Sequence, residues 1–98
     1  MQCIEEGHTY KLNNTQTSQA QEVVFMKRTN GELVHDGTTN EEVLAMLIER
    51  IKYLNEKCAC RENALVITKL EESLHWLNHR TALRIAQGVE TLDKAHKS

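Results

Sequence analysis

Arg80 and Arg84 are the residues of this sequence whose type and spacing best suit the binding of a charged small molecule. They stand one helical turn apart, so in a helix both guanidinium groups project from the same face. Each guanidinium can donate two parallel hydrogen bonds to a carboxylate or a phosphate. The simpler interpretation is a solvated helix end, where positive charge also suits the helix dipole. Spacing alone leaves both interpretations open.

Metal binding is a second chemistry that the residue types suggest. His75 and His79 have the one-turn spacing of two imidazole ligands, and Cys58 and Cys60 offer two thiols. At a helical rise of about 1.5 Å per residue, however, His75 lies about 20 Å from these cysteines. Ligands lie only about 2.0–2.3 Å from a zinc ion, so the two pairs cannot share one within a chain. We expect no metal site and no cofactor.

No residue pattern indicates catalysis. The sequence has no glycine-rich phosphate loop, no nucleophile elbow and no acid pair at a recognisable spacing. A chain of 98 residues also has little room for a buried catalytic pocket. We expect a binding protein and not an enzyme.

Composition narrows the class of partner. The formal net charge is −2, with acidic and basic residues mixed along the chain. No basic stripe or tail is present, which argues against DNA or RNA as a ligand. No apolar run reaches the length of a membrane span, and the polar N-terminus does not resemble a signal peptide. We expect the three cysteines to be reduced thiols, as in a cytosolic protein.

The elements that position these residues begin with a β-sheet part. Residues with high β propensity in "EVVFMKRT" run into Asn30-Gly31, the strongest short-range signal for a two-residue hairpin turn. This pattern predicts strands at about 22–28 and 32–35. "HTYKL" is a further short strand, and "NNTQTSQAQ" has the composition of a loop.

Two helices follow the predicted strands. Thr39 and Glu42 have the spacing of a capping box, and apolar residues then recur at helical spacing, which predicts a first helix over about 40–56. In the second helix, steps of three and four residues form a seam typical of paired helices: Ile67, Leu70, Leu74, Leu77, Thr81 and Arg84. Gly88 is the expected stop. The short connection around "CACRE" predicts an antiparallel helical hairpin.

The predicted fold class is α+β: a small N-terminal antiparallel β-hairpin or sheet, followed by an antiparallel α-helical hairpin. We expect one domain over residues 1–98, with the β-sheet part at 1–36, the helical hairpin at 37–90 and a tail at 91–98. A chain this short, with one Trp, two Tyr and one Phe, builds a thin core. We therefore expect a homo-oligomer, a dimer at least.

The helical segments also resemble a known family. "GTTNEEVLAMLIERIKYLN" followed by "CRENALVITKLEESLHWLNHRTALRIAQGVE" resembles the phage Thoeris anti-defence proteins of the first type, small sponges that sequester nucleotide immune signals. The resemblance covers about residues 37–90. The related anti-CBASS sponge shares the helical hairpin but is essentially helical, so the N-terminal strands favour the Thoeris sponge. The ending "TLDKAHKS" departs from the glycine and short basic tail expected of the family.

The resemblance implies a ligand and a set of contacts. Family members bind cyclic ADP-ribose isomers of the glycocyclic type in pockets at a dimer interface, and they assemble into hexamers. Carried over by motif, Asn63 would contact the adenine, Arg80 and Arg84 would hold the pyrophosphate, and Tyr53 would stack on the base. Tyr53 and Asn63 lie near one end of the predicted hairpin and the arginines near the other. An antiparallel dimer would bring the two ends together.

Some relatives also bind the cyclic di- or trinucleotides of CBASS at a second site between dimers. The candidates here are Thr38 and Thr39 at the start of the first helix and Arg61 before the second, because helix N-termini attract phosphates. Arg28 in the β-hairpin is a further candidate. Helix capping and surface roles are the alternative for all four residues.

These observations predict a non-catalytic sponge that acts in the host cytoplasm during phage infection. The alternative is a helical-hairpin interaction module that binds a host protein, in which the arginines are merely solvated. Binding of a nucleotide signal distinguishes the two.

Overall fold

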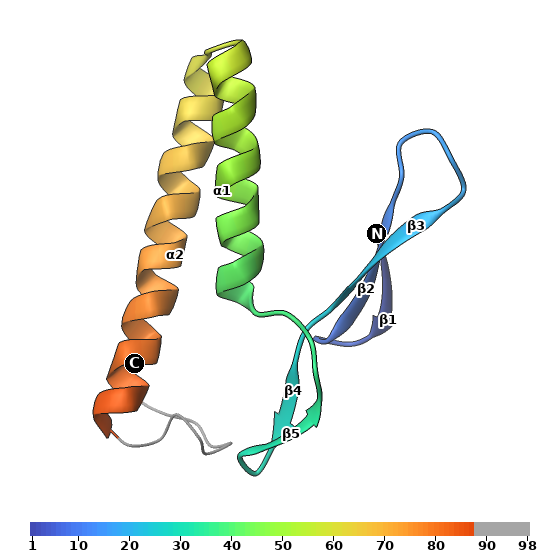
Figure 1. Ribbon diagram of the computed structural model, residues 1–98, viewed down its shortest axis with the longest axis vertical. Coiled ribbons are helices and arrows are strands. Elements are labelled where there is room, and N and C mark those ends of the chain that lie inside the picture. The colour runs from blue at the N-terminus through green and yellow to red at the C-terminus, as the bar shows by residue number, and fades with distance from the viewer. Residues whose placement is uncertain (88–98) are drawn as a thin grey trace. The chain divides into compact units, whose positions relative to one another are not determined.

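The computed structural model describes residues 1–87, and the predicted stop at Gly88 and tail at 91–98 lie outside them. The described part divides into two compact units, Met1–Thr39 and a helical unit that begins at Asn40. Antiparallel strands come first in the chain and a two-helix hairpin follows (Figure 1), so the predicted α+β fold class is confirmed. No helix in the described part is long and apolar enough to cross a membrane.

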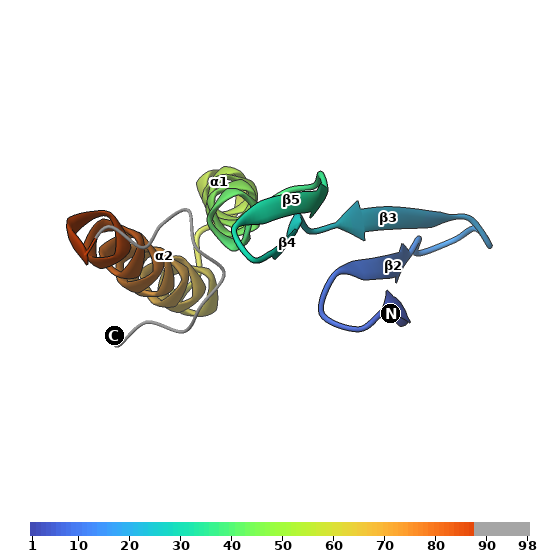
Figure 2. The ribbon, with the colours of Figure 1, turned by 90° about the horizontal axis from the view of Figure 1, so that it is seen from below.

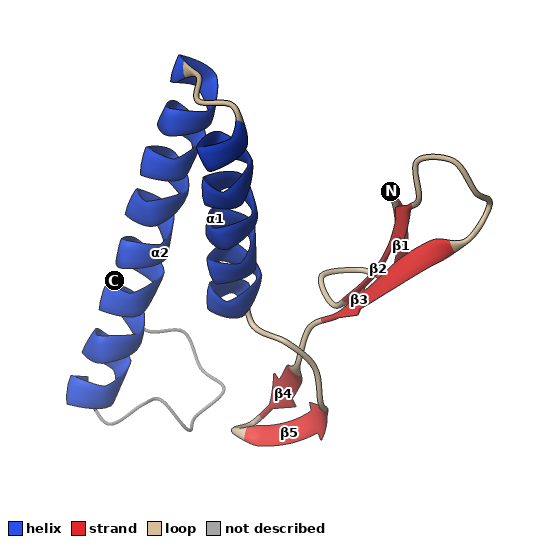
Figure 3. Cartoon of the chain, turned by 45° about the horizontal axis from the view of Figure 1, so that its top comes forward, coloured by secondary structure: helices blue, strands red, loops and turns tan. Residues whose placement is uncertain are grey.

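The N-terminal unit contains two small antiparallel sheets (Figure 3). One sheet has the strand order β1 (Gln2–Glu5), β2 (Thr9–Asn13), β3 (Ala20–Val24), and in the other β4 (Lys27–Thr29) pairs with β5 (Glu32–His35). The turn between β4 and β5 is the predicted one. Asn30 and Gly31 have φ angles of 54° and 80°, as a two-residue type I′ turn requires.

The single strand predicted at 22–28 is two strands in the structure. The chain pairs with β2 as far as Val24, after which Phe25 forms a parallel bridge with Thr38. The N–H of Met26 donates to the carbonyl oxygen of Thr38 at 3.0 Å. The backbone therefore changes partner between β3 and β4. The apolar run continues across this break, so the sequence pattern gives no sign of it.

Gly37 lies where two backbone segments touch. A Cβ at this position would lie 2.5 Å from the carbonyl oxygen of Val24 and 2.6 Å from the nitrogen of Met26. The next residue, Thr38, donates its N–H to the same carbonyl of Val24 at 2.8 Å. Any side chain at position 37 would have to push these segments apart.

The helical unit consists of α1 (Asn40–Lys57) and α2 (Arg61–Gln87), which run antiparallel side by side (Figures 1 and 2). α1 begins directly after Thr39, where the capping-box spacing predicts its start. The predicted seam of α2 is half-buried along its whole length: Ile67, Leu70, Leu74, Leu77, Thr81 and Arg84. Both helices and their pairing are therefore confirmed.

The connection between the helices is fixed by Asn55 and Cys60. The N–H of Cys60 donates to Asn55 Oδ1 at 3.1 Å. Cys60 is also the N-cap of α2, because its Sγ accepts from the N–H of Asn63 at 3.4 Å and its carbonyl from that of Ala64 at 3.2 Å. A thiol sulfur is a weak acceptor, so this cap is poorer than a serine or threonine hydroxyl.

The helical unit has a thin core. Ile48 is the one buried hydrophobic side chain among residues 1–87. Two polar links support the helix pair: Thr81 Oγ1 donates to Glu41 Oε2 at 3.4 Å, and Lys52 Nζ lies 3.1 Å from Glu71 Oε2. Each helix covers the other on one side only, so apolar side chains on the remaining faces stay exposed.

Candidate functional site

Arg80 and Arg84 lie one turn apart on α2, and both side chains are half-buried. The Nε of Arg80 is buried and has no hydrogen-bond partner among the described residues. Leaving a buried donor unpaired costs roughly 1–3 kcal/mol, and more for a charged group. An acceptor that reached this nitrogen would remove that cost, which makes Arg80 the centre of the candidate site.

A hollow of about 650 Å³ surrounds Arg80 on α2. Its described lining is Ser73, Trp76, Leu77, His79, Arg80 and Leu83. Small-molecule sites combine such a mostly apolar lining with a few placed polar groups, and their volumes are of this order. The hollow therefore suits a ligand that has a flat ring and an anionic group.

Trp76 dominates the exposed surface beside Arg80, with 65% of the residue accessible. The rings of His75 and His79 pack edge-on against the indole, with centroids 5.8 Å and 5.7 Å from it. These contacts account for the one-turn spacing of the two histidines. The indole and the apolar side chains in the same hollow form a candidate contact surface for a ligand or another chain.

Tyr53 and Asn63 lie at the other end of the hairpin, near the connection between the helices. Tyr53 is 54% exposed, and Lys57 Nζ lies 5.2 Å from the centroid of its ring, within cation–π range. A stacking base would use the ring face that Lys57 leaves open. Asn63 is half-buried in the first turn of α2.

One chain does not bring these four residues together. Asn63 and Arg80 lie on the same helix, and a rise of about 1.5 Å per residue separates them by about 26 Å. A small ligand cannot contact both positions in one chain. A site that includes all four predicted residues therefore needs a second chain.

The four candidates for a second site do not converge within one chain either. Thr38 and Thr39 precede α1 and Arg61 follows it, so the length of α1, about 27 Å, lies between them. Arg28 Nη1 donates to the carbonyl oxygen of Gly31 at 3.2 Å, across its own turn. The predicted second site stays a prediction that also requires more than one chain.

A second hollow, of about 400 Å³, lies between the two helices and holds none of the predicted residues. Its lining is Ala45, Ile48, Glu49, Lys52, Glu71, Leu74, His75 and Asn78. Lys52 and Glu71 pair with each other there, so neither charge is left to attract an ionic ligand. The hollow beside Arg80 is the better candidate.

Comparison with known proteins identifies this hairpin. Residues 18–82 match the family described as Acb2/Tad1, hairpin domain. The chain belongs to the Acb2/Tad1 hairpin family. A relative from Bacillus phage SBSphiJ7 named Thoeris anti-defense 1 is 55% identical over 56 residues, which are 56% of this chain and 39% of the relative. The family resemblance inferred from the sequence is confirmed.

The match to the Acb2/Tad1 family model covers most of the predicted ligand contacts. It includes Tyr53, Asn63 and Arg80 and ends two residues before Arg84. The chain matches well under half the length of the Bacillus phage relative. Three of the four predicted contacts thus lie inside the part of the chain that defines the family.

Proposed function

We propose that this chain is a phage anti-defence protein that binds a nucleotide immune signal and holds it without cleaving it. The ligand is glycocyclic ADP-ribose, the signal of Thoeris defence. The observation that carries the proposal is the buried Nε of Arg80, which lies beside an apolar hollow and has no hydrogen-bond partner in the described part of the chain. Membership of the Acb2/Tad1 family and the relative named Thoeris anti-defense 1 support the anti-defence role.

The residue types match the chemistry of this ligand. Arg80 and Arg84 can donate charge-assisted hydrogen bonds to a pyrophosphate. Tyr53 offers a flat face for an adenine ring, and the amide of Asn63 can bond the donor and acceptor on its edge. This set contains no nucleophile with an adjacent base. Capture of the signal fits these groups better than turnover, and no cofactor is required.

The site we propose is composite, with half contributed by each of two antiparallel chains. One chain's arginines would then face the other chain's Tyr53 and Asn63. The ligand would not have to span the distance of about 26 Å that separates Asn63 from Arg80 within one chain. Exposed apolar side chains on both helices support such packing: Met46, Leu47, Tyr53, Leu65, Val66, Trp76 and Ile85.

The dimers of this proposal would assemble further. Three dimers would form a hexamer, and Arg28, Thr38, Thr39 and Arg61 from different chains would hold cyclic di- or trinucleotides of CBASS between dimers. Signal capture would take place in the host cytoplasm during infection. The competing function is a hairpin that binds a host protein, which the exposed apolar surface would also suit.

Titration calorimetry with glycocyclic ADP-ribose isomers and with cyclic di- and trinucleotides tests the proposal. A two-fold symmetric dimer has two equivalent composite sites, so we expect one glycocyclic ADP-ribose per chain. Binding of cyclic oligonucleotides alone would reassign the protein to CBASS. If neither ligand class binds at micromolar concentration, the sponge proposal is wrong and the interaction module remains.

A further inference from the structure

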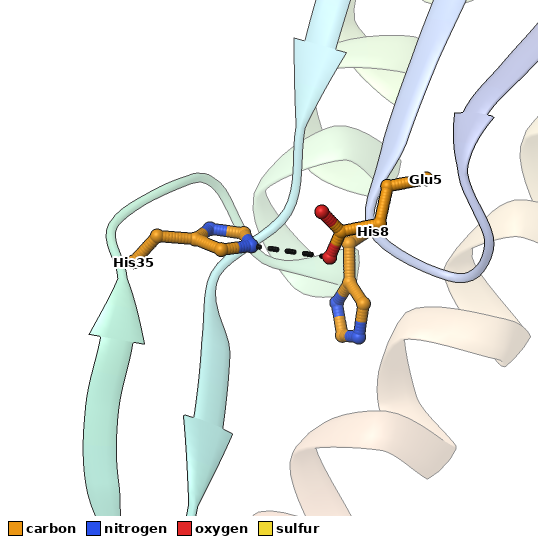
Figure 4. A group of neighbouring side chains, drawn as sticks. All are labelled: Glu5, His8 and His35. Carbon is orange, nitrogen blue, oxygen red and sulfur yellow. Dashed lines mark ion pairs between the residues drawn. The ribbon is translucent and has the colours of Figure 1, made fainter.

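Glu5, His8 and His35 converge in the N-terminal unit (Figure 4). One ligand atom of each side chain lies within 4.8 Å of the others. Glu5 ends β1, His8 lies in the turn before β2, and His35 ends β5. The cluster therefore joins segments from both small sheets of this unit.

We propose that Glu5, His8 and His35 bind a Zn²⁺ ion, whose fourth position is taken by water. Two imidazoles and one carboxylate are a donor set that tetrahedral zinc accepts readily, and imidazole is a good ligand for borderline-soft metals. The sequence-based expectation of no metal site rested on the histidine pair of α2 and the cysteine pair before it, and the N-terminal histidines lie in a different unit. The zinc proposal is independent of the signal site proposed on the helices.

The hydrogen bond of His35 leaves its second nitrogen suited to a cation. Nδ1 lies 3.3 Å from the carbonyl oxygen of Asp36. A carbonyl oxygen can only accept, so Nδ1 carries the hydrogen in this contact. In the neutral ring the lone pair is then on Nε2, which lies 3.6 Å from Glu5 Oε1.

Two lone pairs in this position repel each other unless a cation lies between them. A proton on Nε2 would serve, and so would a metal ion. Metal-bound histidines usually donate their other ring N–H to a backbone carbonyl or a carboxylate. His35 already makes such a bond to Asp36.

His8 supplies an independent observation. Its Nδ1 is buried and has no hydrogen-bond partner among residues 1–87. Buried polar atoms are rarely left unpaired, and a coordinate bond would satisfy this lone pair. The rings of His8 and His35 also pack edge-on, with centroids 5.8 Å apart, so each imidazole restricts the orientation of the other.

Lys27 is the cation that competes for this carboxylate. Its Nζ lies 3.3 Å from Glu5 Oε1, and its side chain is 37% exposed. This ion pair places a positive charge at the carboxylate where the metal ion would otherwise lie. Zn²⁺ binding requires Lys27 to swing into solvent, as long amphipathic side chains can.

The ion would stabilise a unit that has little core of its own. No residue of Met1–Thr39 is buried, and domains below about 40 residues usually need a metal, a disulfide or a partner chain. Because Glu5 and His35 come from different sheets, a shared ion would tie the two sheets together. Metal binding would therefore appear as a gain in thermal stability.

The test is a titration of the full chain with ZnCl₂, followed by calorimetry and thermal unfolding. Replacing Cys3, Cys58 and Cys60 with serine removes the free thiols that would bind zinc elsewhere. We expect one ion per chain and a raised melting temperature. No binding at micromolar zinc, or binding without a rise in melting temperature, would overturn the proposal.

Variants in the same background assign the ligands. His8→Ala and His35→Ala should each weaken zinc affinity by about tenfold or more, as loss of even a supporting group often does. His75→Ala and His79→Ala, two histidines on α2, are matched controls and should leave affinity unchanged. If the control pair weakens binding and the first pair does not, the site lies on α2 and the assignment is wrong.

Lys27→Gln tests the site with every ligand in place, so it is informative even where a histidine variant fails to fold. Zinc can bind only after the ion pair between Lys27 and Glu5 breaks, so removing this lysine should tighten zinc binding by about fivefold, the attraction of two unit charges about 4 Å apart in a water-like dielectric. A purely structural role of Lys27 would leave affinity unchanged or weaken it. Either of those results contradicts the proposed cluster.

Discussion

Replacing Arg80 with alanine should separate ligand binding from folding. Among residues 1–87 the buried Nε of Arg80 has no hydrogen-bond partner, so its removal breaks no hydrogen bond of that atom with this part of the chain. Alanine also has the best helix propensity, which offsets part of the packing lost with the arginine stem. We expect the free energy of unfolding to change by no more than about 1 kcal/mol, measured by urea denaturation.

The loss of ligand affinity should be much larger. A hydrogen bond to a charged group is worth roughly 1.5–3 kcal/mol, which corresponds to a loss of about 10- to 150-fold. Titration calorimetry with glycocyclic ADP-ribose measures it directly. Arg84→Ala should behave alike. Arg80→Lys should restore only part of the affinity, because an ammonium cannot reproduce the two parallel bonds of a guanidinium.

Lys69→Ala is the matched control for charge. It removes one positive charge from the same helix, about 16 Å from Arg80, and Lys69 does not line the hollow. His79 is unsuitable as a control because it lines the same hollow as Arg80. If both arginine variants bind as tightly as the parent, the pocket lies elsewhere. If Lys69→Ala weakens binding equally, overall charge and not the guanidinium pair explains the affinity.

Four further changes test other parts of the account. Gly37→Ala should destabilise the N-terminal unit by about 1–3 kcal/mol in urea denaturation, the usual cost of forced overpacking; an unchanged midpoint would contradict the close backbone contact. Cys60→Ser should raise the free energy of unfolding by about 0.5 kcal/mol or more, because a hydroxyl is a better N-cap than a thiol; a decrease would show that the thiol is preferred there. The pKa of Glu5 is lowered first by the hydrogen bond from Lys27, so its carboxylate should stabilise the fold above its ordinary pKa of 4.5 and lose that effect as the pH falls through the lowered value. The free energies of unfolding of the parent and of Glu5→Gln should therefore become equal in acid. A difference that stays constant at all pH values would show that the ionised carboxylate does not stabilise the fold. Trp76→Asp should shift the mass seen by light scattering toward the single-chain 11.3 kDa, and an intact oligomer would place the interface elsewhere.

The helical hairpin was predictable because its signals are local. The seam from Ile67 to Arg84 repeats at three- and four-residue steps, and each of its members is half-buried in the structure. Thr39 stands directly before α1, and Asn30-Gly31 adopts the positive φ angles of its turn. In each case a few neighbouring residues determine the backbone conformation.

The two sheets were less predictable because their strands pair with segments that are distant in sequence. The short exposed strand β1 has no alternating pattern, and it forms by pairing with β2. The break after Val24 depends on Thr38, which supplies hydrogen bonds from another part of the chain. A run of β-forming residues shows that a strand is favoured but not where it changes partner.

The candidate site was predictable in part. The spacing of Arg80 and Arg84 predicted their shared helix face. It did not predict that the Nε of Arg80 is buried without a partner among residues 1–87, or that Trp76 lies beside it. The cluster of Glu5, His8 and His35 was not predicted, because no local spacing links residues that meet only when β5 reaches the turn before β2. Such contacts become visible only with the tertiary structure.

Release of the bound signal tests the central claim most directly. The protein is mixed with glycocyclic ADP-ribose, freed of unbound ligand by gel filtration and denatured by heat, and the supernatant is analysed by mass spectrometry. A sponge releases the intact molecule, about one per chain, and none appears before heating. A cleaved product, or no ligand retained through gel filtration, would contradict sequestration.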